Sequence, residues 1–219
     1  MSLTKTEAAE LVQDMLSGGQ TPDNYKISIA QIIKACDSAL SYLIAKHYLI
    51  NRADGDDIDG AFVSAFPKNT VYFDKDRFEY FIPMPARMVK LPGGGDKGIK
   101  QISGVRGQDA IFIKIPNGAI GVMAPLESSR LLGKIGYYIE NEKIFFVDRT
   151  RDLEGNQNGK IKGISNVMVK MIASIDGLDD DEPMPLPSDM EVEFLTILQQ
   201  LFAGEKATPV DDTNDNHSK

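Results

Sequence analysis

Cysteine and histidine are scarce in this sequence of 219 residues. The single cysteine, Cys36, has no second thiol with which to form a disulfide framework or a thiolate metal cluster, and one thiol fits a reducing cytosolic origin. Of the two histidines, His47 lies in an apolar helical pattern and His217 in a polar tail. Histidine-based catalysis needs partner side chains around a fixed imidazole, so we expect His47 to be a packing or interface residue.

Long hydrophobic runs are also missing. The longest apolar stretches are far shorter than the ~20 residues that a membrane-spanning helix needs. The first residues, Met1–Lys5, lead into a polar amphipathic segment without the apolar centre of a signal peptide. We therefore expect no membrane partner.

Positive charge is nearly absent from the last fifth of the chain. Residues 176–219 contain 12 Asp and Glu but only two lysines, Lys206 and Lys219, so this segment has a formal charge of −10. The whole chain has a formal charge of −8, which leaves +2 for the rest. A nearly neutral body argues against a broad basic face for nucleic acid.

Two helical patterns occupy the first quarter. Apolar residues recur at helical spacing from Ala8 to Leu16, and Gly18-Gly19 indicates the end of that helix. A longer pattern covers about residues 29–50. A helix with two apolar stripes needs burial on more than one side, so we expect one side to pack within the domain and the other against the first helix or another subunit. The first stripe contains Ile29, Ile32, Ile33, Cys36, Leu40, Leu43 and His47, and the second contains Ala35, Ala39, Tyr42 and Leu49.

The middle of the chain has the alternation of β-strands. Three hairpins are predicted, in residues 71–82, 111–122 and 135–147, and the second has Asn117-Gly118, a strong signal for a tight turn. Residues 164–175 are rich in β-branched residues and methionine and indicate a last strand.

The C-terminal quarter begins with a proline-rich run, residues 183–187, which proline geometry makes extended. It is either a spacer or a strap laid over the body or a neighbour. Ser188 and Glu191 have the spacing of a capping box, which predicts a helix that closes near Gly204. From Ala207 onward the polar tail has too little apolar surface to fold alone.

These patterns predict an α+β protein, with one compact domain plus appendages or two small domains. The body is expected to be an antiparallel, hairpin-rich sandwich or a barrel-like sheet. The expected parts are an N-terminal helical pair (residues 1–52), the β-rich body (53–176), the proline-rich strap and C-terminal helix (177–204), and an acidic polar tail (205–219).

Two acidic loops resemble calcium-binding loops but lack essential positions. A loop that starts at Asp54 and Asp56 would place Ala65 at its twelfth position, and one that starts at Glu154 would place Ser165 there. Neither residue can supply the bidentate carboxylate of an EF-hand. We expect no catalytic residue, metal or cofactor, and hence no enzyme. The alternative is a hydrolase with a carboxylate-only magnesium site, drawn from Asp54, Asp56, Asp59 or the Glu154 loop.

The order of the short motifs is similar to that of a known family. They are the Gly18-Gly19 helix end, the Thr21–Asn24 turn, Tyr80–Pro85, Leu91-Pro92, Gly98–Ile102, Asp181–Met190 and Thr208–Asp215. This order resembles the ring or adaptor proteins, head–tail connectors in the neck and tail of short-tailed crAss-like bacteriophages.

The resemblance implies a non-enzymatic virion component, assembled in the cytoplasm of the bacterial host. Copies would form a ring, dodecameric to match a portal, that meets the portal or neighbouring ring and tail proteins. DNA would pass only transiently through the channel, flanked by the acidic loop or tail. A monomeric protein-binding module with a disordered acidic tail is the alternative. The candidate interface residues are Ile29, Ile33, Cys36, Leu40, Tyr42, Leu43, His47, Pro183, Pro185, Pro187, Leu195, Leu198, Phe202, Asp211, Asp212 and Asp215.

Overall fold

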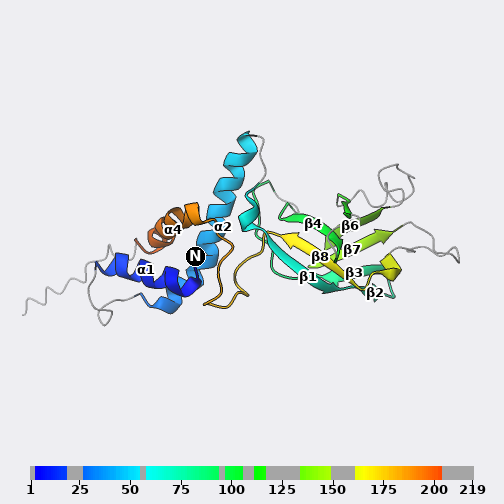
Figure 1. Ribbon diagram of the computed structural model, residues 1–219, viewed down its shortest axis with the longest axis horizontal. Coiled ribbons are helices and arrows are strands. Elements are labelled where there is room, and N and C mark those ends of the chain that lie inside the picture. The colour runs from blue at the N-terminus through cyan, green and yellow to red at the C-terminus, as the bar shows by residue number, and fades with distance from the viewer. Residues whose placement is uncertain are drawn as a thin grey trace, which may run out of the picture. The chain divides into compact units, whose positions relative to one another are not determined.

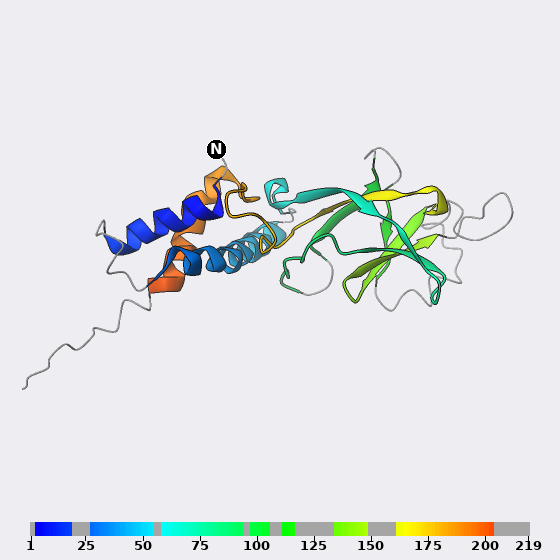
Figure 2. The ribbon, with the colours of Figure 1, turned by 90° about the horizontal axis from the view of Figure 1, so that it is seen from below.

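The computed structural model describes residues 3–18, 27–54, 58–93, 97–105, 111–116, 134–148 and 161–203. The chain forms two compact units. The helical unit combines residues 1–53 with residues 175–219, and the β unit is the continuous stretch 54–174 (Figures 1 and 2). The predicted α+β class is confirmed, with helices at both ends of the sequence and a β-rich centre.

The helical unit begins with α1, Lys5–Ser17. The Thr4 hydroxyl accepts a hydrogen bond from the backbone N–H of Glu7 at 3.1 Å, and the Glu7 carboxylate accepts one from the N–H of Thr4 at 3.0 Å. This reciprocal capping box satisfies two otherwise unpaired donors. The helix ends, as predicted, at Gly18, whose φ of 61° is the left-handed value that glycine tolerates.

The second helix, α2, runs from Ile29 to Asp54. Ser28 and Gln31 form a second reciprocal cap at its start, with the Gln31 side chain 2.8 Å from the N–H of Ser28. The helix continues four residues beyond the predicted end. Across the described ranges, no helix combines the length and hydrophobicity needed to cross a membrane.

The capping box predicted at Ser188 and Glu191 is wrong. Ser188–Met190 forms a 3₁₀ turn, η4, closed by a bond from the N–H of Met190 to the carbonyl of Pro187 at 3.0 Å. Pro187 therefore takes the capping position and offers no side-chain acceptor. The last helix, α4, is Glu191–Ala203. The buried Oε1 of Glu191 has no hydrogen-bond partner among the described residues.

The β unit contains two separate sheets, so the sandwich rather than the barrel-like alternative describes it. Among the strands that the structure describes, all pairs are antiparallel except β5 with β6, which is parallel. One sheet has the order β1 (Ser64–Thr70), β8 (Asn166–Met171), β4 (Ile99–Gly104). The other has the order β2 (Tyr72–Asp74), β3 (Glu79–Pro83), β7 (Lys143–Asp148), β6 (Ile135–Glu140), β5 (Ile113–Lys114).

Both sheets contribute to one hydrophobic core. Along β8, buried residues alternate with partly exposed ones, as expected for a strand with one face inward. The core includes Ile102 and Val169 from the three-stranded sheet, and Ile82, Ile144 and Phe146 from the five-stranded sheet. The shared core holds the two sheets together as one unit.

Two of the three predicted hairpins are confirmed, β2–β3 and β6–β7. The turn between β6 and β7 consists of Asn141 and Glu142, with φ values of 49° and 58°. The predicted Asn117-Gly118 turn lies outside the described residues. The part of that hairpin that is described, β5, pairs with β6.

Replacement of Glu142 by glycine should stabilise the protein. Glu142 has the φ of a type I′ turn position, where a Cβ costs ~1–2 kcal/mol, whereas glycine costs about 0.5–1 kcal/mol of chain entropy. We expect Glu142→Gly to raise the free energy of unfolding by up to about 1 kcal/mol in urea titrations. Lys143→Gly, one residue later in β7, is the control and should be destabilising.

Candidate assembly interface

The first apolar stripe of α2 lies mostly inside the protein. Cys36, Leu40 and Leu43 are fully buried, and Ile29, Ile33 and His47 are partly buried. The Cys36 thiol donates a hydrogen bond to the carbonyl of Ile32 at 3.4 Å, and burial raises its pKa to about 11. Such a thiol is a small hydrophobic packing residue rather than a nucleophile.

The second stripe is divided between the interior and the surface. Ala39 is buried, whereas Tyr42 is 62% exposed and Leu49 is 53% exposed. Ile50, which belongs to neither predicted stripe, is 47% exposed. Its position eight residues after Tyr42, a spacing that recurs along one apolar stripe, could have indicated its place on the same side of the helix. We call Tyr42, Leu49 and Ile50 the α2 apolar face.

In α4, Leu195 and Leu198 are buried and Phe202 is partly buried. Phe194 is also fully buried. The sequence prediction omitted it, although its four-residue spacing from Leu198 places both on one helix face. The buried members of α4 thus belong to the interior of the protein, like the first stripe of α2, and their role in contacts between copies stays a prediction.

Helices α2 and α4 are joined by a charged cluster. Glu193 in α4 lies with its two carboxylate oxygens 2.7 Å from Lys46 Nζ and 3.0 Å from His47 Nε2. Hydrogen bonds from Lys46 and then His47 hold the pKa of Glu193 below its usual range. Within the chain, His47 is therefore a partly buried residue with a carboxylate partner.

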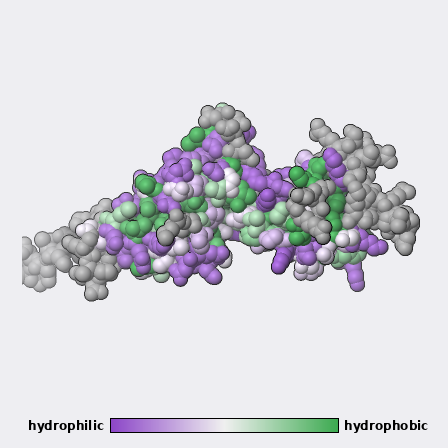
Figure 3. Space-filling view, viewed as in Figure 1, coloured by the Kyte–Doolittle hydropathy of each residue, from purple (hydrophilic) through white to green (hydrophobic). Residues whose placement is uncertain are grey.

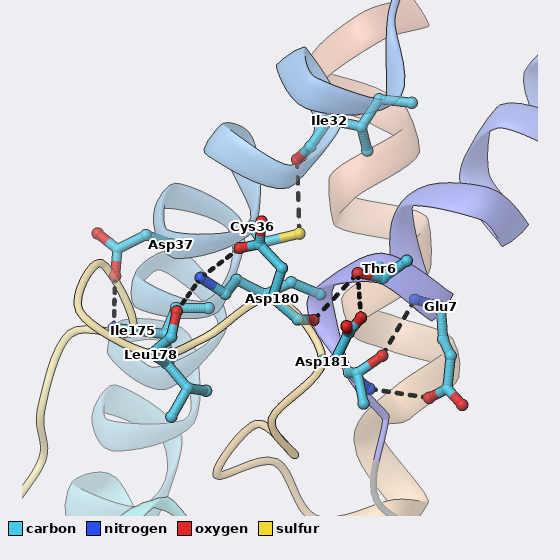
Figure 4. A network of polar contacts seen from close by, with 11 residues as sticks. Thr6, Glu7, Ile32, Cys36, Asp37, Ile175, Leu178, Asp180 and Asp181 are labelled. Carbon is cyan, nitrogen blue, oxygen red and sulfur yellow. Dashed lines mark hydrogen bonds and ion pairs between the residues drawn. The ribbon is translucent and has the colours of Figure 1, made fainter.

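Residues 175–187, which we call the strap, lie along the beginning of α1 and one side of α2 (Figure 4). The N–H of Thr6 donates to the carbonyl of Asp180 at 3.1 Å, and the N–H of Met184 donates to that of Leu3 at 3.0 Å. The N–H of Ile175 donates to the Asp37 carboxylate at 2.9 Å. The strap therefore contacts the helical unit of its own chain.

Lys5 is the charged residue at the centre of this contact. Its side chain is buried, forms an ion pair with Asp180 at 3.0 Å, and donates to the carbonyl of Leu178. The neighbouring Thr6 hydroxyl donates to the Asp181 carboxylate at 2.9 Å. Asp180 and Asp181 thus lie at the N-terminus of α1, where the helix dipole favours negative charge.

The prolines are not the main contacts of the strap. Pro183 is exposed, Pro185 is partly buried and Pro187 is buried. Met184 and Leu186, which alternate with them, are buried. The prolines restrict the strap to an extended path, and the side chains between them supply the apolar contact.

A pocket of about 330 Å³ lies beside the strap in the helical unit. Its lining mixes three aspartates and two lysines with apolar residues: Lys5, Ala30, Ile33, Lys34, Asp37, Ile175, Asp176 and Asp180. Within the described ranges, no group of three His, Cys, Asp or Glu side chains could hold a metal ion. Asp56 and the Glu154 loop of the hydrolase alternative lie outside those ranges, as do the tail candidates Asp211, Asp212 and Asp215.

No protein-family model and no curated protein matches this sequence.

Loss of the Lys5 charge should loosen the strap. Lys5→Met keeps the length of the side chain but leaves the Leu178 carbonyl and the Asp180 carboxylate without their ammonium partner. We expect the free energy of unfolding, measured in urea, to fall by about 1–3 kcal/mol. The matched control is Lys68→Met, at an exposed lysine of β1 away from the strap, with a change below about 0.5 kcal/mol. Equal effects of the two substitutions would show that Lys5 does not hold the strap.

The cluster of Glu193, Lys46 and His47 should make the thermal stability of the protein depend on pH. Because its folded pKa is depressed, Glu193 contributes stability that is complete above the unfolded pKa of about 4.5 and is lost as pH falls through the folded pKa. Glu193→Gln should therefore lower the thermal midpoint at neutral pH, and the difference from the unsubstituted protein should vanish in acid. Thermal unfolding at a series of pH values checks this. A difference that is constant with pH would contradict it.

Proposed function

We propose that this chain is a structural protein of a short-tailed bacteriophage virion that assembles into a ring in the neck or tail. The ring connects the portal to downstream tail components and leaves a channel through which DNA passes. The order of motifs that resembles crAss-like phage ring proteins supports this assignment. The structural observation that carries it is the α2 apolar face.

The α2 apolar face is unusual because it lies on a helix whose opposite side is already buried. Tyr42, Leu49 and Ile50 lie within about two turns of each other and are each close to half exposed or more. In Figure 3, hydrophobic patches interrupt the hydrophilic surface of the helical unit. Grouped large apolar side chains with no cover from the described residues of their own chain are typical of a protein–protein interface.

Charge is distributed between the units in a way that suits head-to-tail assembly. The helical unit has 17 Asp and Glu against seven Lys and Arg, a formal charge of −10, whereas the β unit has 15 against 17, a charge of +2. A ring is built from heterologous contacts, in which two different surfaces of consecutive copies meet. Opposite charge on the two surfaces favours that register over contact between like units.

The exposed acids of the strap suit a DNA channel. Asp179, Asp181 and Glu182 are exposed, and like charge keeps a phosphate backbone from binding to the wall. We place this side of the helical unit toward the channel. A closed ring makes individually weak contacts sufficient because each copy is held from two sides.

Assembly should depend on the α2 apolar face. The double substitution Tyr42→Glu and Leu49→Glu places charge where we expect the neighbouring copy, so rings seen by negative-stain electron microscopy and the large species in light scattering should be lost. Val192→Glu, at an exposed apolar position of α4, is the control and should leave them intact. A chain that stays monomeric at high concentration, also with portal and neighbouring tail proteins added, would exclude the proposal.

A further inference from the structure

The β2–β3 hairpin, residues 72–83, presents three aromatic rings at the surface of the β unit. Tyr72 is 50% exposed, Phe73 is 44% exposed and Phe78 is 73% exposed. The rings of Phe73 and Phe78 meet edge to face, with centroids 6.4 Å apart. Aromatic side chains dominate binding energy at protein interfaces, so the exposed Phe73–Phe78 pair is a candidate contact surface.

Phe78 has a backbone conformation that its side chain disfavours. Its φ is 56°, in the left-handed region where glycine is the usual residue. The turn is otherwise well closed, because the Asp74 carboxylate accepts from the N–H groups of Asp76 at 3.0 Å and Arg77 at 3.2 Å. The chain therefore carries a strained phenylalanine whose ring remains mostly exposed. Such strain at an exposed residue points to a role in binding rather than in folding.

The hairpin is supported by aromatic rings that cross the sheet. Tyr72, Phe81, Phe145 and Tyr138 stand opposite one another on four consecutive strands. Successive ring centroids are 5.8, 5.7 and 5.3 Å apart. These contacts fix the strand that carries the exposed rings, and a fixed surface loses less entropy when it binds.

Two cations add to this support. The Arg77 guanidinium forms a bidentate pair with the Glu140 carboxylate at 2.8 and 3.1 Å and lies 4.9 Å from the ring centre of Phe145. Lys143 Nζ lies 4.6 Å from the ring centre of Phe81. The turn is thereby joined to the β6–β7 hairpin as well as to its own strands.

The β2 strand is an edge of its sheet. It pairs with β3 on one side, and no strand among the described residues pairs with its other side. An edge of this kind presents backbone donors and acceptors to a further strand. Tyr72 and Phe73 are consecutive residues of this edge strand, so their rings are on opposite faces of the sheet. A strand added there would meet the backbone of β2, the rings of Phe73 and Phe78 on one face, and Tyr72 with Asp74 and Glu79 on the other face.

The size and charge of the patch indicate what occupies it. The exposed parts of the Phe73 and Phe78 rings, which share one face, amount to roughly 200 Å², far less than the ~800 Å² that each partner buries in a stable protein complex. One extended segment fits this area, whereas a globular face does not. Basic side chains are favoured, because the hairpin has three acids, Asp74, Asp76 and Glu79, against two bases, Lys75 and Arg77, and Arg77 is already paired with Glu140.

We propose that β2 binds an extended segment of a partner protein as an additional strand of the five-stranded sheet. Apolar side chains on one face of the segment pack on Phe73 and Phe78, and the basic side chains between them, on the other face, meet Asp74 and Glu79. This mode of recognition takes affinity from the backbone and specificity from alternate side chains. This binding does not require copies of the chain to assemble into a circular oligomer, so it is tested separately from the assembly proposed above.

The test uses the full chain and the blocked peptide Lys-Val-Lys-Phe-Lys-Val, with binding followed by fluorescence anisotropy. Phe78→Gly should weaken binding at least about tenfold while the thermal midpoint stays equal or rises, since glycine relieves the left-handed φ. Val192→Ala, at an exposed apolar residue of the helical unit, should leave binding unchanged. If Phe78→Gly does not fold, Phe78→Asn, which tolerates the same φ, replaces it.

Two further peptides separate the parts of the proposal. Lys-Pro-Lys-Phe-Lys-Val keeps the aromatic ring but lacks one backbone donor, and Glu-Val-Glu-Phe-Glu-Val reverses the charge; both should bind at least about tenfold more weakly than the first peptide. Failure of the first peptide to bind, or equal affinity for all three, would overturn the proposal. So would unchanged binding by Phe78→Gly, or tighter binding of single-stranded oligothymidine than of the first peptide.

Discussion

The ammonium group of Lys5 is buried beneath the strap, and a buried charge is tolerated only where fixed partners surround it. The partners, the Leu178 carbonyl and the Asp180 carboxylate, come from the other end of the chain. The strap leads directly into η4 and α4, and Glu193 of α4 forms an ion pair with Lys46 of α2. The order of the helical unit thus follows from one contact between residues more than 170 positions apart. The acidic residues 179–182, which look like a solvated segment in the sequence, include the Lys5 partner Asp180 and the Thr6 partner Asp181.

Local patterns were enough to predict most of the elements, whereas contacts over long separations were not. Helix α1 and the β6–β7 hairpin follow from periodicity and from residues within a few positions, such as Gly18 and Asn141. The path of the strap depends on Thr6 and Lys5, which no spacing relates to Asp180. At Ser188 a local rule was misleading, because the adjacent Pro187 favours a 3₁₀ turn. Phe78 was missed since the sequence has no glycine there to indicate a left-handed residue.

The candidate interface residues of α2 could likewise not be assigned from local sequence patterns alone. Two apolar stripes on one helix predict two contacts, but they do not say which stripe is used within the chain. Cys36 and Leu40 are buried inside, and Tyr42 and Leu49 are left outside. Alternation along β8 is simpler to interpret, since a strand of a sandwich has one inward face. A helix can instead be covered by α1, by α4 or by the strap, and this choice depends on packing that the sequence pattern does not specify.

The division of the chain into units also has a consequence for synthesis on the ribosome. The β unit is one continuous stretch, residues 54–174, so it has all its strands as soon as that stretch has emerged. The helical unit needs residues from both sides of it. Helices α1 and α2 are made first but have neither the strap nor α4 to cover them until the β unit has been translated. The part of the protein that is synthesised earliest therefore completes its fold last.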